Sequence, residues 1–218
     1  MYNITLISTL HKELGKCNSD ELYTIIHSIR PDVIFEEMSP DLFDSVYIKN
    51  QFSEESLETK SIKRYLQNYD IKHFPVDIDI TKNISVEDYH SMHHTFRQHD
   101  VYRKLDYEFN VMLKQKGFSY LNSKECEMII DKMKLTEEIL IESGIIQNRI
   151  INSHKLFDEL SQKRENKIIE NIYNYSSENQ YNQAVLLIGV GHRKSIIKKI
   201  ESYKEQENVM LNWTFYGS

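Results

Sequence analysis

The first third of the chain alternates short apolar runs with stretches of helical periodicity. Strands are predicted at residues 3–9, 32–38 and 71–79, where short, largely apolar runs end in polar residues. A helix is predicted from about Asn18, because the apolar residues that follow share one helical face: Leu22, Ile25, Ile26 and Ile29. A second amphipathic helix is predicted at 54–69. The order strand, helix, strand predicts a βαβ unit, whose strands form a parallel pair.

The middle of the chain, residues 85–176, shows long helical patterns and no convincing strand. Residues 184–189, with the sequence AVLLIG, are apolar on both faces, which predicts a central strand. A helix at 192–206 and a last strand at 209–216 follow. We therefore expect an α/β fold: a single domain, 1–218, with a central, mostly parallel sheet flanked by helices. The helical middle, residues 85–176, is expected to be an insertion within this domain that caps a site at the edge of the sheet.

Composition and charge limit the classes of partner that we expect. The net charge is -6, with 27 Lys and Arg against 33 Asp and Glu mixed along the chain, so no nucleic-acid surface is expected. No apolar run approaches the ~20 residues of a membrane-spanning helix, so no membrane insertion is expected. The two cysteines form no CxxC motif, which suits a reducing compartment, and a cytoplasmic protein is expected.

Polar side chains stand where the predicted strands end. His11 follows the first strand, Glu36 and Glu37 close the second, and His192 follows the fourth. Asp77 lies near the end of the third strand and is a weaker candidate. Ligands of open parallel sheets bind at the carboxyl ends of the strands, so these side chains are expected to meet at one edge. A single histidine near a strand end is usually structural. Two histidines and a carboxylate at the same edge of one sheet together favour a site.

A glycine pair precedes the second of these histidines. Gly189 and Gly191 flank Val190 between the buried strand and His192. We expect them to allow a sharp turn, or a close approach to a ligand. His192 would then lie on the first helical turn, near free backbone N–H groups, where a neutral imidazole is favoured over a charged one.

One arginine occupies an inward-facing position. Arg164 lies in an otherwise apolar stripe with a spacing of four residues: Leu160, Arg164, Ile168 and Ile172. A guanidinium on a buried face needs a partner. Two interpretations stay open: a structural salt bridge, or a role in the site in which Arg164 binds a substrate carboxylate or stabilises an oxyanion.

Four motifs together resemble the TraB/TIKI/PrgY family and its more distant relatives, ChaN and the erythromycin esterases. The family's GTxH motif corresponds to ISTLH at 7–11, and its PDVVFVEL strand to RPDVIFEEM at 30–38. An ERNxxMAxxI-like helix corresponds to KRENKIIENI at 163–172, and a GxGH strand end to VLLIGVGH at 185–192. The chain departs from the family at Ser8, where glycine is usual, at Ile168-Ile169 in place of Met-Ala, and at Asp77-Ile78-Asp79, where many relatives have Asp-Arg-Asp.

The resemblance implies a site built from His11, Glu37 and His192, with Glu36 as the alternative glutamate. In the TIKI branch these motifs are associated with divalent-metal proteolysis, so a Mn, Co or Zn ion held by the three residues is expected. The implied activity is hydrolysis of a peptide, ester or lactone bond in a small-molecule or peptide substrate, with Arg164 steadying negative charge. A metal-free variant, in which a histidine is the general base, stays open.

The same resemblance allows a second function. The ChaN branch is linked to haem, and PrgY-like relatives are regulatory. A non-catalytic binding or regulatory protein that uses the same cleft is therefore the alternative. For either function the expected binding residues are Glu36, Asp77, Gly189 and Gly191.

Overall fold

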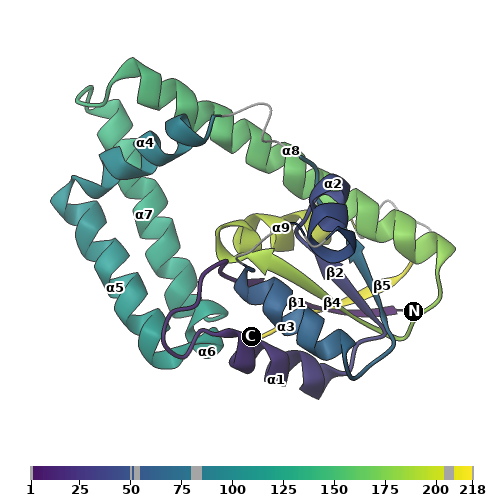
Figure 1. Ribbon diagram of the computed structural model, residues 1–218. Coiled ribbons are helices and arrows are strands. Elements are labelled where there is room, and N and C mark those ends of the chain that lie inside the picture. Colours follow the sequence, from purple (N-terminus) through teal and green to yellow (C-terminus); the bar gives the residue numbers. More distant parts are fainter. Residues whose placement is uncertain (1, 50, 52–54, 80–84, 204–208, 218) are drawn as a thin grey trace.

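Five parallel strands form the centre of the molecule (Figure 1). The computed structural model describes residues 2–49, 51, 55–79, 85–203 and 209–217. The strands lie in the order β3-β2-β4-β1-β5, with these bounds: β1 Tyr2–Thr9, β2 Val33–Glu36, β3 Lys72–Pro75, β4 Gln183–Gly189 and β5 Leu211–Phe215. The sheet and its flanking helices confirm the α/β fold.

The central strand is β4, as its uninterrupted apolar sequence predicts. It pairs with β1 and β2, and its register sets Gly189 opposite Thr9 and Leu187 opposite Glu36. The carboxyl ends of three strands therefore lie at one edge of the sheet. The expected pairing of the first two strands was wrong: β1 and β2 are parallel, but β4 lies between them.

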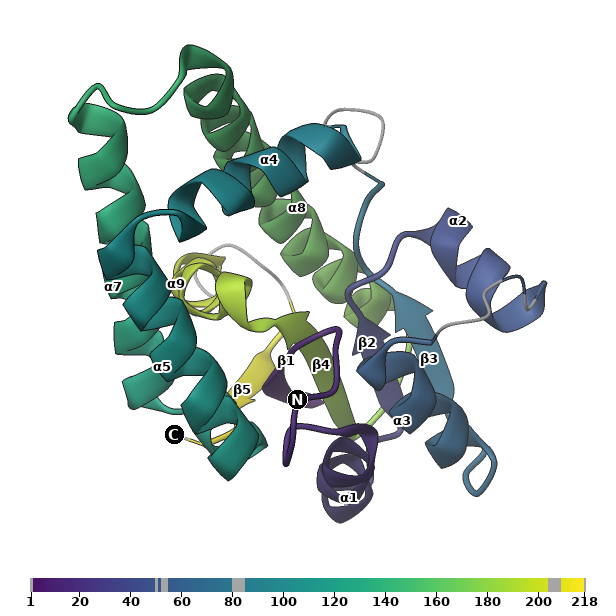
Figure 2. The ribbon, with the colours of Figure 1, turned by 60° about the vertical axis from the view of Figure 1, so that its left-hand side comes forward.

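Helices cover both faces of the sheet (Figure 2). The side chains of the strands alternate between two apolar layers, one under each set of helices. On β2, Phe35 packs into the layer with α8 (Asn148–Glu178) and α9 (Arg193–Tyr203). Ile34 packs into the opposite layer, formed mainly with α1 (Ser19–Ile29) and α3 (Leu57–Leu66). This alternation decides which helices each residue at the end of the strand can reach.

Local signals in the sequence set the ends of α1. The Asn18 side chain accepts a hydrogen bond from the backbone N–H of Glu21 at 3.0 Å, which caps the first turn. The helix closes at Arg30, whose φ of 54° lies in the left-handed region immediately before Pro31. A residue before proline avoids the right-handed helical region, so the chain leaves the helix there.

One helical segment was not predicted from the sequence. The short helix α2 (Pro40–Phe43) runs into a π-helical turn, η1 (Asp44–Ile48), directly after β2. The Ser39 side chain caps it by accepting a hydrogen bond from Leu42 N at 3.4 Å, and proline stands at its first position. Strands β2 and β3 are correspondingly shorter than expected. The expected helix ends at 54 and 204–206 lie outside the described residues.

The helical middle has a small core of its own. It contains α4 (Val86–Arg97), α5 (Asp100–Lys116), α6 (Phe118–Leu121), α7 (Lys124–Glu142) and α8. Helices α4, α5 and α7 extend to one side of the sheet in Figure 1, with a separate apolar cluster at their far end: Met92, Phe96, Tyr102, Ile146 and Ile150. No described helix has the length and apolar character needed to cross a bilayer.

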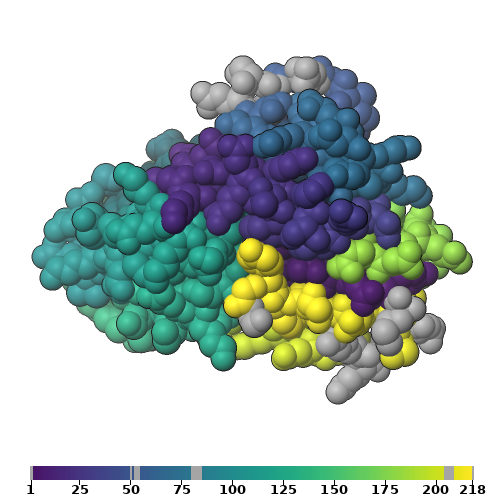
Figure 3. All heavy atoms as spheres, turned by 90° about the horizontal axis from the view of Figure 1, so that it is seen from below, coloured from purple at the N-terminus to yellow at the C-terminus, as the bar shows by residue number. Residues whose placement is uncertain are grey.

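The two ends of the chain meet on one surface. Strands β1 and β5 pair directly, with Tyr2 opposite Leu211, and the space-filling view shows the first and last segments side by side (Figure 3). The helical middle forms the neighbouring part of that surface. Strand β5 is thus an edge strand of the sheet, and the candidate site lies elsewhere, where β2 and β4 end.

Candidate active site

Glu37 is the centre of the polar cluster at the sheet edge. Its Oε1 accepts a hydrogen bond from Arg164 Nη2 at 2.7 Å, and its Oε2 accepts one from Gly189 N at 2.5 Å. His192 Nε2 lies 3.6 Å from Oε1. The side chain is buried, with 8 % exposed. The structure thus brings together Glu37 and His192, two of the three residues that carry the predicted site.

Arg164 holds two carboxylates at once. Besides Glu37, its Nε and Nη2 donate to Asp77 Oδ2 at 2.9 and 2.5 Å. Both acids and the guanidinium are largely buried. Although burial acts against the charge, the hydrogen bonds that Arg164 donates to Asp77 and Glu37 raise its pKa. The salt-bridge interpretation of Arg164 therefore accounts for these contacts, and Asp77 joins the cluster through the arginine.

A buried carboxylate stands behind His192. Glu165, on α8, accepts from His192 Nδ1 at 2.8 Å and from Ser195 Oγ at 2.5 Å. Burial acts against its charge, but the hydrogen bonds from His192 and Ser195 hold the pKa of Glu165 below its ordinary value. Glu165 therefore faces the Nδ1 side of the His192 ring, and Nε2 is the nitrogen on the Glu37 side.

Glu36 and Glu37 diverge, as strand alternation predicts. The two oxygens of Glu36 accept from Tyr47 Oη at 2.8 Å and from His73 Nδ1 at 2.7 Å. Neither partner belongs to the Glu37 cluster. Glu37 is therefore the glutamate that joins the two-histidine site, and Glu36 belongs to a separate network with η1 and β3.

His11 lies across a cavity from this cluster. The cavity measures about 320 Å³, and its wall includes His11, Glu36, Glu37 and Glu58. His11 Nδ1 is 3.2 Å from Glu58 Oε1. The remaining wall is largely apolar: Met38, Leu42, Val46, Ile62 and Leu187. Glu37 is the link, because it lines the cavity and also neighbours His192.

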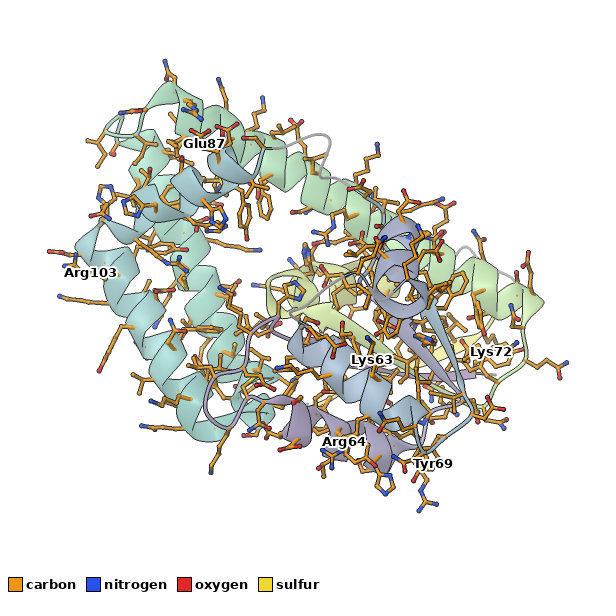
Figure 4. All side chains as sticks on the ribbon, viewed as in Figure 1. Lys63, Arg64, Tyr69, Lys72, Glu87 and Arg103 are labelled. Atoms are coloured by element: carbon orange, nitrogen blue, oxygen red, sulfur yellow. The ribbon has the colours of Figure 1, made fainter. Side chains whose placement is uncertain are left out.

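The helical middle brings Arg164 and Glu165 to the site from α8, and Lys134 of α7 donates to the carbonyl of Gly191 at 3.4 Å. Arg164 and Glu165 are adjacent on α8, and the cavity wall contains no residue of the 85–176 insertion. In Figure 4 the label of Lys63 marks the part of α3 that lines the cavity. The labels of Glu87 and Arg103 mark α4 and α5, at the left of the view and away from α3. Capping of the cavity by the insertion stays a prediction.

The two glycines differ in what surrounds them. A Cβ on Gly189 would lie 3.2 Å from Glu37 Oε2, so the close approach expected of the pair exists here, to a carboxylate. A Cβ on Gly191 would meet nothing within 4 Å. Neither has a positive φ. A special requirement for glycine is therefore found at Gly189, and the expected requirement at Gly191 was wrong.

Ser8, which departs from the family pattern, is part of a buried structural network. Its N–H donates to Asn122 Oδ1 at 2.7 Å, and its hydroxyl accepts from Arg193 Nη1 at 3.3 Å. Arg193 also donates to the same Asn122 oxygen at 3.1 Å. These bonds tie the end of β1 to the helix that follows His192, and so support the placement of both histidine loops.

The expected metal ligands are brought together only in part. Both Glu37 oxygens already accept strong hydrogen bonds, from Arg164 and Gly189. Nδ1 of each histidine faces another glutamate, Glu165 or Glu58, which leaves Nε2 as the nitrogen that could bind an ion. In the part of the chain that the structure describes, no group of three or more His, Cys, Asp or Glu side chains lies ready to hold a metal ion, and a divalent ion bound by His11, Glu37 and His192 stays a prediction.

Glu58 and Glu165 were not singled out from the sequence. Each is an acidic residue on a helix, and such residues are usually solvated. A signal did exist for Glu58, which precedes Ile62 by four residues and Tyr65 by seven and so shares their buried stripe. Glu165 precedes the buried Ile168 and Ile169 by three and four residues, and carried the same signal.

Comparison with known proteins returns no relative. No family model, no curated protein and no solved structure matches this chain.

Proposed function

We propose that the protein is a hydrolase of small esters or lactones that works by general acid–base catalysis. The observation that carries the proposal is the buried Glu165–His192 pair, whose Nε2 faces Glu37 at the wall of a cavity. The motif resemblance to the TraB/TIKI/PrgY group and the erythromycin esterases supports the reaction class. The cavity, at about 320 Å³ and with a largely apolar wall, favours a small acyl substrate over a folded peptide.

His192 is the general base in this mechanism. Glu165 keeps the proton on Nδ1, so Nε2 accepts a proton from water as the water oxygen attacks the carbonyl carbon. The tetrahedral intermediate collapses as the carbon–oxygen bond to the alcohol breaks, and His192 returns the proton to the departing alkoxide. One water is consumed, and a carboxylic acid and an alcohol are released.

Arg164 and Glu37 maintain the geometry of this reaction. Arg164 neutralises Glu37 and Asp77, which would otherwise repel each other's charge beside the base. Glu37 in turn binds the backbone N–H of Gly189 and so fixes the turn that carries His192. The glutamate thereby sets the distance between the base and the cavity.

A panel of p-nitrophenyl esters of increasing acyl length, together with simple lactones, tests this function. We expect the wild type to hydrolyse short acyl esters, and His192→Gln to lose about 100-fold or more of kcat. His94→Gln, which alters an exposed histidine on α4, should leave kcat unchanged. Equal turnover by His192→Gln would overturn the proposal. Tight retention of a ligand without turnover by the wild type would favour the non-catalytic alternative.

A further inference from the structure

We infer that Glu58 is a positioning residue that holds His11 at the cavity wall as a charged hydrogen-bond donor to the substrate's carbonyl oxygen. The inference rests on the proposed hydrolase function, and it assigns the group that stabilises the negative charge of the tetrahedral intermediate.

The backbone fixes His11 against the start of α3. His11 lies two residues beyond the end of β1, and its carbonyl accepts a hydrogen bond from Leu57 N at 3.4 Å. Leu57 is the first residue of α3, and Glu58 is the second. The side chains of His11 and Glu58 therefore meet because two backbone segments are joined, and not through the chance positions of two long side chains.

The Glu58 carboxylate has an unusual environment. Both oxygens are buried without a well-oriented hydrogen-bond donor, and His11 Nδ1, at 3.2 Å from Oε1, is the cationic group beside them. A buried carboxylate that lacks good donors is costly. Burial acts against its charge, yet the interaction with His11 holds the pKa of Glu58 below its ordinary value. The carboxylate therefore stays ionised beside the imidazole.

Three charged groups act on His11. The contact with Glu58 favours the imidazolium, burial opposes it, and the more distant Glu37 and Arg164 act in opposite directions. Together they raise the pKa of His11 from 6.5 to about 9, so the ring is charged at neutral pH. Since Glu58 occupies the Nδ1 side, the Nε2–H bond is left to donate toward the cavity that both residues line.

The other cationic donors near the cavity are already committed. Arg164 donates to Glu37 and Asp77, and Lys63 binds Glu55 at 2.6 Å. The backbone N–H of Gly189 is taken by Glu37. These pairings leave the role of oxyanion donor to His11, which was expected from the sequence to bind a metal.

The experiment compares Glu58→Gln and Glu58→Asp with Glu137→Gln, which alters a glutamate paired with another histidine, His154, outside the cavity. Two readouts are used: kcat and KM for the best ester substrate, and the titration of the His11 ring nitrogens followed by ¹H–¹⁵N NMR. We expect Glu58→Gln to move the His11 midpoint toward 6.5 and to lower kcat by about 10-fold while KM stays within about 2-fold. This loss is smaller than that of a fully buried donor, because the His11 side chain is 68 % exposed and water screens the pair.

The remaining variants show whether Glu58 acts by positioning His11 or only by stabilising the fold. Glu58→Asp should restore part of kcat, and Glu137→Gln should change neither kcat nor the His11 midpoint. An unchanged His11 midpoint in Glu58→Gln would overturn the pairing. A shifted midpoint with unchanged kcat would overturn the catalytic role of His11. If the wild type hydrolyses no ester or lactone, the proposed function and the role of His11 in it both fail, while the titration still decides whether Glu58 holds the ring.

Discussion

His192 Nδ1 lies 2.8 Å from Glu165 Oε1, and this bond joins the turn after β4 to the middle of α8. Arg164, the neighbour of Glu165 on the same helix, binds Glu37 at the end of β2. Adjacent residues on a helix point about 100° apart, so one turn of α8 reaches two different strand ends. Helix α8 therefore sets the distance between His192, the proposed general base, and Glu37 at the cavity wall.

The first prediction concerns Glu165. Glu165→Gln removes the ionised acceptor that keeps the His192 proton on Nδ1, and we expect kcat for ester hydrolysis to fall about 100-fold. The measurement is steady-state kinetics, together with urea unfolding to show that the variant is folded. Glu170→Gln is the matched control, since Glu170 lies on the same helix and pairs with Lys167 near the surface. Full activity in Glu165→Gln would show that His192 does not depend on this carboxylate.

Arg164 is predicted to matter for stability as well as for activity. Arg164→Met leaves Glu37 and Asp77 buried without their cation, and such a change costs about 3–5 kcal/mol of the free energy of unfolding. Arg103→Met, at an exposed pair with Asp100 on α5, should cost less than about 1 kcal/mol (Figure 4). Urea unfolding of both variants checks this. A loss for Arg164→Met no larger than that of Arg103→Met would contradict the central role of the guanidinium.

Local features of the chain predicted much of the fold. The apolar sequence of β4 identified it as the central strand, and alternation along β2 correctly separated Glu36 from Glu37. The pairing of β1 with β4, and not with β2, depends on packing between segments about 180 residues apart, as in the register of Asn3 with Gln183. Such packing leaves no local trace in the sequence.

The candidate site was predictable only in part, for a related reason. His192 and Glu37 follow strands, and the edge where parallel strands end is known once the strands are known. Glu58 and Glu165 lie on helices. A glutamate on a helix is buried only when the helix packs against a group that can pair with the carboxylate, here His11 or His192. The expected metal site was predicted from the residues that meet at the sheet edge. Whether Glu37 can bind an ion also depends on the hydrogen bonds that its oxygens accept from Arg164 and Gly189, which the sequence does not show.

The glycine before His192 gives a matched pair of variants. Gly189→Ala places a Cβ 3.2 Å from Glu37 Oε2, and Glu37 cannot yield freely because Arg164 holds its other oxygen. We expect a loss of about 1 kcal/mol in the free energy of unfolding and a clear loss of kcat. Gly191→Ala meets nothing within 4 Å and should be neutral. Thermal unfolding and ester kinetics measure both, and equal behaviour of the two variants would contradict this account of Gly189.

Removal of metal ions is predicted to leave hydrolysis intact. Both oxygens of Glu37 already accept hydrogen bonds from Arg164 and Gly189, and the proposed acid–base mechanism needs no divalent ion. The measurement is ester turnover after dialysis against EDTA, and again after addition of Mn²⁺, Co²⁺ or Zn²⁺. Loss of turnover on chelation that one of these ions restores would re-establish the metal centre, and with it a ligand role for His11, Glu37 and His192.

The ion pair between His11 and Glu58 predicts how stability depends on pH. The folded-state pKa of His11, about 9, lies above its ordinary 6.5. A histidine with a raised pKa contributes stability that is fully present below the unfolded-state value and is lost as the pH rises through the folded-state value. We therefore expect the wild type to lose its advantage in unfolding free energy over His11→Gln between about pH 6.5 and pH 9.

Urea unfolding of both proteins at several pH values across this interval measures the effect. The difference between wild type and variant must be used, because other groups titrate as well: the hydrogen bond to Glu137 also raises the pKa of His154. Since that group is present in both proteins, its contribution cancels in the difference. Burial raises the pKa of the Cys17 and Cys126 thiols to about 12, and since both proteins carry them, their contribution also cancels in the difference. A difference that stays constant or grows with pH would mean that His11 is not charged beside Glu58 in the folded protein.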